Sequence, residues 1–219
     1  AETGVEVRDD EPLLSLELAP PGVIVSTPNE TFKARCLVGC DGAHSLVART
    51  LGLSTPESGA AIEAEIAAPE DVVAQWADQV YVSYASPPWG YGWVFPKRHG
   101  LSVGVGSFAP RNARLPLHLD RFLAHCELDK YPKEVSGHPI PTGGKRSHLH
   151  QGPVCPAGDA ASLCDPLSGE GISHALLSGH IAARHVIQYL DDRVQDFSGY
   201  QEEIDEKITA DLALARWIA

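Results

Sequence analysis

The residues best suited to chemistry in this chain lie in one loop, PAGDAASLCDPLSGEGISHA, at positions 156–175. Gly158 permits close approach of a ligand to the backbone, and the carboxylate of Asp159 can accept hydrogen bonds from ligand hydroxyls. The run GEGI at 169–172 then leads into a long helical pattern, whose first N–H groups and dipole favour a neighbouring negative charge. The loop therefore suits a ligand with hydroxyls at one end and a site of negative charge at the other.

A flavin has both features, with ribityl hydroxyls beside Asp159 and its N1/C2 carbonyl edge at the start of the helix. The anion of a reduced flavin would be stabilised there by the helix dipole. The alternative is a purely structural loop, in which Asp159 caps a turn and the glycines supply left-handed backbone angles. The local pattern leaves both interpretations open.

A second candidate stretch is LVGCDGAHSLVAR at 37–49, in which Asp41-Gly42 follows a buried apolar run. The Asp41 carboxylate could hydrogen-bond a cofactor ribose or water bound to a pyrophosphate, while Ser45 is placed to cap the helix that follows. Asp-Gly turns are common, so this motif gains weight from its order and spacing before the 156–175 loop.

A third stretch, YGWVFP at 91–96, places large aromatic rings at alternate positions of a predicted strand. Trp93 and Phe95 therefore share one face of that strand and could wall a pocket for an apolar chain. The alternative is that these rings belong to the core of the sheet.

Together the three stretches resemble the geranylgeranyl reductase family of FAD-dependent oxidoreductases, which have the para-hydroxybenzoate hydroxylase type of fold. The family's Gly-Asp loop is matched by residues 158–179, with Ser162 where glycine is usual. The resemblance covers most of residues 5–190. It implies that the cofactor is bound by Asp41, Gly42, Ser45, Gly158, Asp159, Pro166, Gly169, Gly171 and Ile172, and that the substrate is bound by Tyr91, Trp93 and Phe95.

The resemblance also implies a reaction, the reduction of C=C bonds in a polyprenyl or geranylgeranyl-type lipophilic substrate. Hydride would pass from reduced FAD to one alkene carbon, and an acid or water would protonate the other. NAD(P)H or a reduced ferredoxin is the implied electron donor, and a prenyl substrate suggests peripheral contact with a membrane. No catalytic acid is assigned.

Two alternatives stay open. An aromatic hydroxylase of the same superfamily would usually have His after Asp-Ala-Ala and a Gly-Gln-Gly turn, where this chain has Ser162 and Gly-Glu-Gly. A non-catalytic fragment without FAD is the other alternative, because no Gly-x-Gly-x-x-Gly cradle for the ADP half is found. The chain has no Met and opens on AETG, which is typical of a helix end, so we expect an internal piece of a longer polypeptide.

The composition of the chain limits the classes of partner that we expect. The 219 residues are 43% hydrophobic, enough for a packed core, and the net charge of −12 disfavours nucleic acid. With no apolar run near 18 residues and no signal peptide, we expect a cytoplasmic protein, membrane-associated at most through its substrate. The five cysteines form no CxxC pair and are expected to be mostly buried thiols; His148 and His150 are expected in a polar loop, so no metal is predicted.

The elements that position these residues are predicted from hydrophobic period. Period-two alternation over 60–108 predicts one antiparallel sheet. Further strands are predicted at 5–8, 13–18, 22–27, 36–39, 138–142 and 152–157, and helices at 45–51, 115–128, 170–190 and 195–217. In the 170–190 helix, one face is predicted to be buried: Ile172, Leu176, Gly179, Ala183, Val186 or Ile187, and Leu190.

The predicted fold class is α/β, or mixed α+β. A partial FAD-binding Rossmann-like domain, formed by 1–55 with the Asp-Gly motif and by 151–219 with the Gly-Asp loop, is interleaved with an antiparallel-sheet substrate domain at 56–150.

Overall fold

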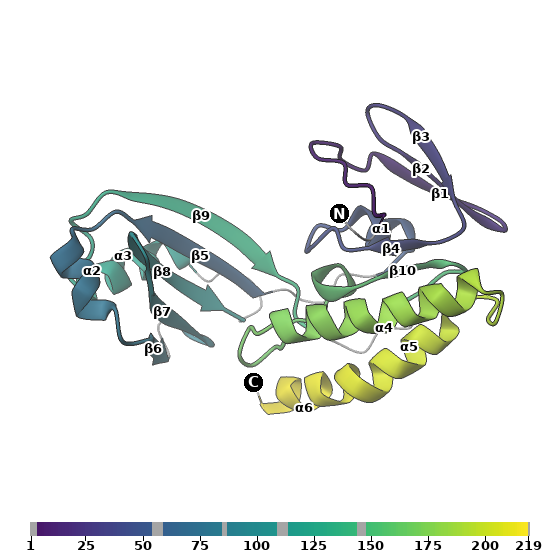
Figure 1. The fold of residues 1–219 in the computed structure, drawn as a ribbon. Helices are drawn as coiled ribbons and strands as arrows, with labels where there is room; N and C mark the ends of the chain where they lie inside the picture. Colours follow the sequence, from purple (N-terminus) through teal and green to yellow (C-terminus); the bar gives the residue numbers. More distant parts are fainter. Residues whose placement is uncertain (1–3, 54–58, 85–86, 109–113, 144–147, 219) are drawn as a thin grey trace. The chain divides into compact units, whose positions relative to one another are not determined.

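The computed structural model describes residues 4–53, 59–84, 87–108, 114–143 and 148–218. It confirms the mixed class of helices, parallel strands and antiparallel sheet (Figure 1). Contacts divide the chain into two compact units. The first takes the described residues within 1–54, 145–163 and 172–210, and the second those within 55–144, 164–171 and 211–219. Residues 164–171 and 211–218, which the sequence prediction grouped with the first unit, make their contacts within the second.

In the described part of the first unit there are two small sheets and the 19-residue helix α4. Strands β1, β2 and β3 form an antiparallel meander, and β4 pairs in parallel with β10. Its elements are β1 (Ser15–Ala19), β2 (Gly22–Ser26), β3 (Thr31–Ala34), β4 (Leu37–Gly39), α1 (Leu46–Thr50), β10 (Val154–Pro156), the 3-10 turn η1 (Gly158–Ala161), α4 (Ile172–Leu190), α5 (Ser198–Ile204) and the π-helical η2 (Asp205–Thr209).

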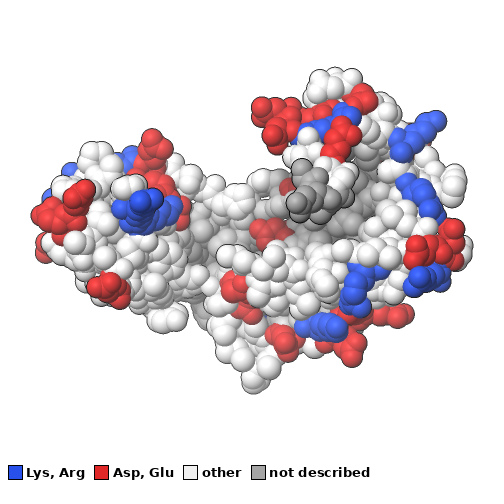
Figure 2. Space-filling view, in the orientation of Figure 1, with Lys and Arg blue, Asp and Glu red and all other residues white. Residues whose placement is uncertain are grey.

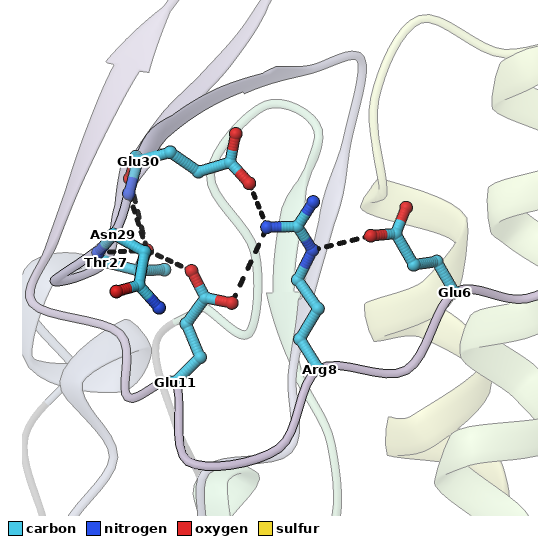
Figure 3. Close-up of polar contacts among 6 residues, drawn as sticks. All are labelled: Glu6, Arg8, Glu11, Thr27, Asn29 and Glu30. Atoms are coloured by element: carbon cyan, nitrogen blue, oxygen red, sulfur yellow. Dashed lines mark hydrogen bonds and ion pairs between the residues drawn. The ribbon is translucent and has the colours of Figure 1, made fainter.

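The strand predicted at 5–8 is wrong, because this segment pairs with no strand in the part of the chain that the structure describes. It is held by side chains instead (Figure 3). Arg8 forms ion pairs with Glu6 at 2.8 Å, with Glu11 at 3.5 Å and with Glu30, which lies in the turn before β3. The alternation of apolar and polar residues in this segment therefore does not mark a strand of any described sheet. Residues 1–3, where a helix end was expected, lie outside the described residues.

The buried face predicted for α4 is also wrong. The buried residues of α4 are Ser178, Ile181 and Ala182, and α4 contacts α5 and η1. Ile172 and Leu176 of the predicted stripe are 77% and 72% exposed. Because small side chains allow closer packing, the helix is buried along its Ser178 and Ala182 side rather than along its most apolar stripe.

Glu203 of α5 anchors α5 to α4. Its carboxylate lies 2.6 Å from Lys207 Nζ and 3.3 Å from His185 Nε2, and it accepts a hydrogen bond from Arg184. The hydrogen bond from Lys207, followed by those from Arg184 and His185, lowers the pKa of Glu203 to about 2. The side chain is only 16% exposed, so these partners hold a shielded charge between the two helices.

The second unit is built on a five-stranded antiparallel sheet of order β6-β7-β8-β5-β9. On one face, valines of β7 and β8 pack with Leu119 and Phe122 of α3 to form a hydrophobic core. The elements are β5 (Gly59–Ile66), α2 (Glu70–Trp76), β6 (Tyr81–Tyr84), β7 (Gly90–Lys97), β8 (Gly100–Ser107), α3 (Leu115–His125), β9 (Lys133–Ile140) and α6 (Ala210–Ile218).

Two elements of this unit differ from the sequence prediction. Strand β9 begins at Lys133, earlier than the predicted start at 138, because an exposed edge strand needs no apolar alternation. Pro139 is tolerated there because an edge strand has a neighbour on one side only, so its missing N–H leaves no second strand without a donor. Helix α2 was missed. Its first turn carries Glu70 and Asp71, which suit the positive end of a helix dipole.

The surface is acidic overall but mixed in sign locally. On the face drawn in Figure 2, Asp and Glu lie close to Lys and Arg in small groups, with no continuous basic patch among the residues shown in colour. Among the described residues, no helix has the length and apolar character needed to cross a membrane. The expectation of mostly buried thiols is wrong: Cys155 and Cys164 are buried, Cys36 and Cys126 are intermediate, and Cys40 is exposed.

Candidate cofactor and substrate sites

Asp41 organises the turn between β4 and α1. Its Oδ1 accepts a hydrogen bond from Ser45 Oγ at 2.5 Å, and its Oδ2 accepts from the backbone N–H groups of Leu46 at 2.7 Å and Val47 at 3.1 Å. Ser45 Oγ in turn accepts from Ala48 N–H at 2.8 Å, so the predicted cap is confirmed. Both oxygens of Asp41 are thus engaged inside the chain, satisfying N–H groups that the helix leaves without a partner.

The backbone of this turn needs its glycines. Gly42 has φ of +72°, in the left-handed region that favours glycine. Gly39, at the end of β4, faces Val47 of α1 so closely that an added Cβ would lie 2.6 Å from Val47 Cβ. These two positions bring α1 directly against the strand end.

The Gly-Asp motif occupies the turn after β10. Gly158 has φ of +56°, its N–H donates to Ser178 Oγ at 3.0 Å, and an added Cβ would lie 3.1 Å from Ala175 Cβ. The motif is therefore packed directly against α4. The Asp159 carboxylate is half-buried and, unlike that of Asp41, has no hydrogen-bond or ion-pair partner among the described residues. It remains available to a ligand.

The two motifs lie at the same end of one strand pair. In the parallel register, Pro156 of β10 lies opposite Gly39 of β4, and the N–H of Ala157 donates to the carbonyl of Gly39 at 2.8 Å. Asp41 and Asp159 therefore follow the carboxyl ends of adjacent parallel strands. This is the edge at which open α/β sheets bind their ligands.

The loop at 165–170, in the second unit, is closed by its own hydrogen bonds. Asp165 N–H donates to the carbonyl of Glu170 at 2.7 Å, and Asp165 Oδ1 accepts from the N–H groups of Leu167 at 2.9 Å and Ser168 at 2.7 Å. Pro166 is buried, whereas Gly171 is half-buried. Ile172, which follows as the first residue of α4, is 77% exposed. The sequence-based assignment of Pro166, Gly169, Gly171 and Ile172 to cofactor binding stays a prediction.

Tyr91, Trp93 and Phe95 form an aromatic row on β7. Ring centroids are 6.0 Å apart for Tyr91 and Trp93, and 6.0 Å for Trp93 and Phe95. Val94, between them, belongs to the core under α3, so the row lies on the opposite face of the sheet. Phe95 is 38% exposed and the other two rings are half-buried. Their assignment to substrate binding stays a prediction, which this placement favours over the core alternative.

Two linked hydrogen bonds, which the sequence did not reveal, fix the indole ring of Trp93. Trp93 Nε1 donates to Ser102 Oγ at 3.3 Å, and Ser102 Oγ donates to Glu63 Oε2 at 2.6 Å. Gly104 lies directly under the indole, since an added Cβ would lie 2.1 Å from Trp93 Cζ2. The alternating pattern of β5 puts Glu63 on one face of its strand. Only the register of β5 against β8 shows that this is the face on which Trp93 lies.

Comparisons with known proteins identify the family to which this chain is similar. A family model described as "FAD binding domain" matches residues 2–197. The chloroplastic geranylgeranyl diphosphate reductase of Oryza sativa subsp. japonica is 31% identical over 166 residues, which cover 72% of this chain and 35% of the relative. The digeranylgeranylglycerophospholipid reductase of Methanocella arvoryzae is 29% identical over 189 residues, covering 81% of this chain and 47% of the relative.

The fold also matches a solved structure, that of a geranylgeranyl bacteriochlorophyll reductase-like protein from Thermoplasma acidophilum. The TM-score is 0.78 at 24% identity, over 94% of this chain and 56% of that chain. This chain spans less than half the length of the two curated relatives described above. The resemblance to geranylgeranyl reductases that rested on three motifs is confirmed by these relatives, and the family match spans the Asp-Gly turn, the aromatic row and the Gly-Asp loop. The chain belongs to the family of FAD-binding domains.

Proposed function

We propose that this chain is the part of an FAD-dependent reductase that holds the ribityl region of the cofactor and presents a face to a polyprenyl-type substrate. The observation that carries the proposal is the Asp159 carboxylate, half-buried and without a partner among the described residues. It follows the same strand-pair end as Asp41, whose oxygens are already engaged. The names of the relatives support the choice of a prenyl substrate.

The residues present fit a flavin. A carboxylate accepts hydrogen bonds only, which suits the hydroxyl donors of a ribityl chain. Gly158, held in a left-handed conformation, places no side chain between Asp159 and α4. In this proposal Asp159 binds and orients the ribityl chain, and Asp41 keeps α1 and its turn in place beside it. When bound, FAD supplies the hydride for reduction of a C=C bond.

The aromatic row supports an apolar substrate. Three rings side by side on a sheet face offer a surface that can cover a prenyl chain and exclude water from it. We propose that Tyr91, Trp93 and Phe95 bind this chain, that NAD(P)H or a reduced ferredoxin supplies the electrons, and that the substrate brings the protein to a membrane surface in the cytoplasm. The second hydrogen of the product comes from an acid or from water.

The test is the binding of FAD to the full-length protein and to Asp159→Ala. Hydrogen bonds to a charged group contribute about 1.5–3 kcal/mol, so the variant is expected to bind FAD about 10- to 100-fold more weakly. Without FAD its thermal denaturation should match that of the wild type, because Asp159 has no described partner. Asp78→Ala, which removes an exposed Asp without a described partner, is the matched control and should leave FAD affinity unchanged. Unchanged FAD occupancy in Asp159→Ala would refute the ribityl role.

The reaction itself is tested by mass spectrometry of products. With geranylgeranyl diphosphate, FAD and an electron donor, the wild-type protein is expected to add two hydrogens for each double bond reduced. Insertion of one oxygen into an aromatic substrate, with no reduced prenyl product, would favour the hydroxylase alternative. Absence of bound FAD in the purified full-length protein would favour a non-catalytic role.

A further inference from the structure

Tyr91 makes two kinds of contact within the second unit. Its ring is part of the aromatic row, and its hydroxyl donates a hydrogen bond to the carbonyl of Ser168 at 2.7 Å. Ser168 lies in the 165–170 loop, for which the sequence predicts cofactor contacts. Burial, with smaller contributions from Cys164 and Tyr84, raises the pKa of Tyr91, so its hydroxyl stays protonated and able to donate at neutral pH.

The turn at Gly169 also packs closely against the aromatic rings of the second unit. Gly169 has φ of +74°, and an added Cβ would lie 2.8 Å from Phe108 Cζ and 3.3 Å from Tyr91 Oη. The carbonyl of Gly169 accepts a weak hydrogen bond from Cys164 Sγ at 3.1 Å. The turn therefore fits against the rings of Tyr91 and Phe108 only because it carries no side chain there. The hydrogen bond from the Tyr91 hydroxyl to the carbonyl of Ser168 ties this turn to β7.

We propose that Tyr91 is a positioning residue that couples the aromatic row to the 165–170 loop. Its ring packs against whatever apolar chain lies on the row, and its hydroxyl fixes the carbonyl of Ser168. A ligand that restrains the ring also restrains the loop, since one rigid side chain carries both contacts. This inference rests on the proposed function for the identity of the apolar ligand and for the role of the loop, but not for the hydrogen bond itself.

The first experiment measures amide hydrogen exchange of the flavin-free full-length protein. Tyr91→Phe keeps the ring and removes the hydroxyl. The amides of Leu167 and Ser168, which donate to Asp165, are expected to exchange about fivefold faster, the factor that corresponds to one ordinary hydrogen bond. Tyr84→Phe is the matched control. Tyr84 is 80% exposed, lies beside Tyr91 with ring centroids 6.3 Å apart, and its hydroxyl has no hydrogen bond among the described residues.

Unchanged exchange of these amides in a folded Tyr91→Phe protein overturns the inference. So does an equal increase in Tyr84→Phe, because the effect would then not be specific to the Ser168 contact. Gly169→Ala disturbs the same turn by a separate route, through contact with Phe108, and is expected to speed exchange of the same amides. Its failure to do so would also count against the described packing of the turn.

The second experiment tests the coupling with geranylgeraniol as the apolar probe. The probe is expected to slow exchange of the loop amides in the wild type and to do so less in Tyr91→Phe. Equal slowing in both proteins, or slowing in neither, overturns the coupling. FAD titration separates this outcome from the proposed function. A wild-type protein that binds no FAD refutes the proposed function, whereas one that binds FAD while Tyr91→Phe binds it equally, with unchanged loop exchange, refutes the role of Tyr91.

Discussion

Replacement of Gly104 by alanine would place a methyl group against the indole of Trp93. The added Cβ would lie 2.1 Å from Trp93 Cζ2, whereas carbon atoms in contact are normally about 3.5–4.0 Å apart. The ring would have to move by more than about 1 Å, and its 3.3 Å hydrogen bond to Ser102 has little room to lengthen. Overpacking of this kind lowers the free energy of unfolding by about 1–3 kcal/mol.

Thermal denaturation followed by circular dichroism is the assay. For a chain of this length, about 2–4 °C of melting temperature corresponds to each kcal/mol, so Gly104→Ala is expected to melt about 2–12 °C lower than the wild type. Its near-ultraviolet spectrum should change as well, because the displaced ring is a tryptophan. Where no clash arises, replacement of a strand glycine by alanine instead raises the free energy of unfolding by about 0.5–1 kcal/mol.

Gly106→Ala is the matched control. At this position the added Cβ would lie 3.7 Å from Trp93 Cζ3, an ordinary contact on the same strand and face. We expect an unchanged or slightly higher melting temperature and an unchanged near-ultraviolet spectrum. If Gly104→Ala and Gly106→Ala behave alike in both measurements, the indole is not held against Gly104 and the description of the row is refuted.

Two further predictions concern the first unit. Asp41→Ala is expected to lower the free energy of unfolding by about 1–2 kcal/mol even without FAD, because it removes the acceptor of the first N–H groups of α1 and the hydrogen bond that orients the Ser45 cap; an unchanged melting temperature of the flavin-free protein would contradict this. The pKa of Glu203 is lowered in the folded chain. Its stabilising effect is therefore complete above about pH 4.5 and is lost as the pH falls from there towards 2. Glu203→Gln should therefore melt below the wild type at pH 6, with a difference that shrinks towards pH 2; a difference independent of pH would argue against this role.

Motifs that depend on local backbone chemistry could be predicted from the sequence. Gly42 and Gly158 stand where the backbone has positive φ, and Ser45 stands directly before the helix that it caps. The antiparallel sheet could also be predicted, because period-two alternation requires only that one face be buried. These features are encoded within a few neighbouring residues.

Features that depend on distant partners could not be predicted. Hydrophobic period located an apolar stripe on α4 but carried no information on which side other elements would cover, and Ser178 and Ala182 proved to be the buried side. The bond between Ser102 and Glu63 joins residues 39 positions apart, and depends on the register of β8 against β5. The alternation at 5–8 lacked a partner strand in the same way.

The 165–170 loop has one more consequence, for how this fold can be divided or recombined. The chain leaves the first unit after Leu163 and returns to it at Ile172, with the loop packed in the second unit between them. Neither unit is a single continuous stretch, so a gene fragment that ends near either boundary would encode parts of both and the whole of neither. A single genetic crossover could therefore not exchange one unit for a homologous one as a cassette, because each unit is encoded by separated segments of the gene.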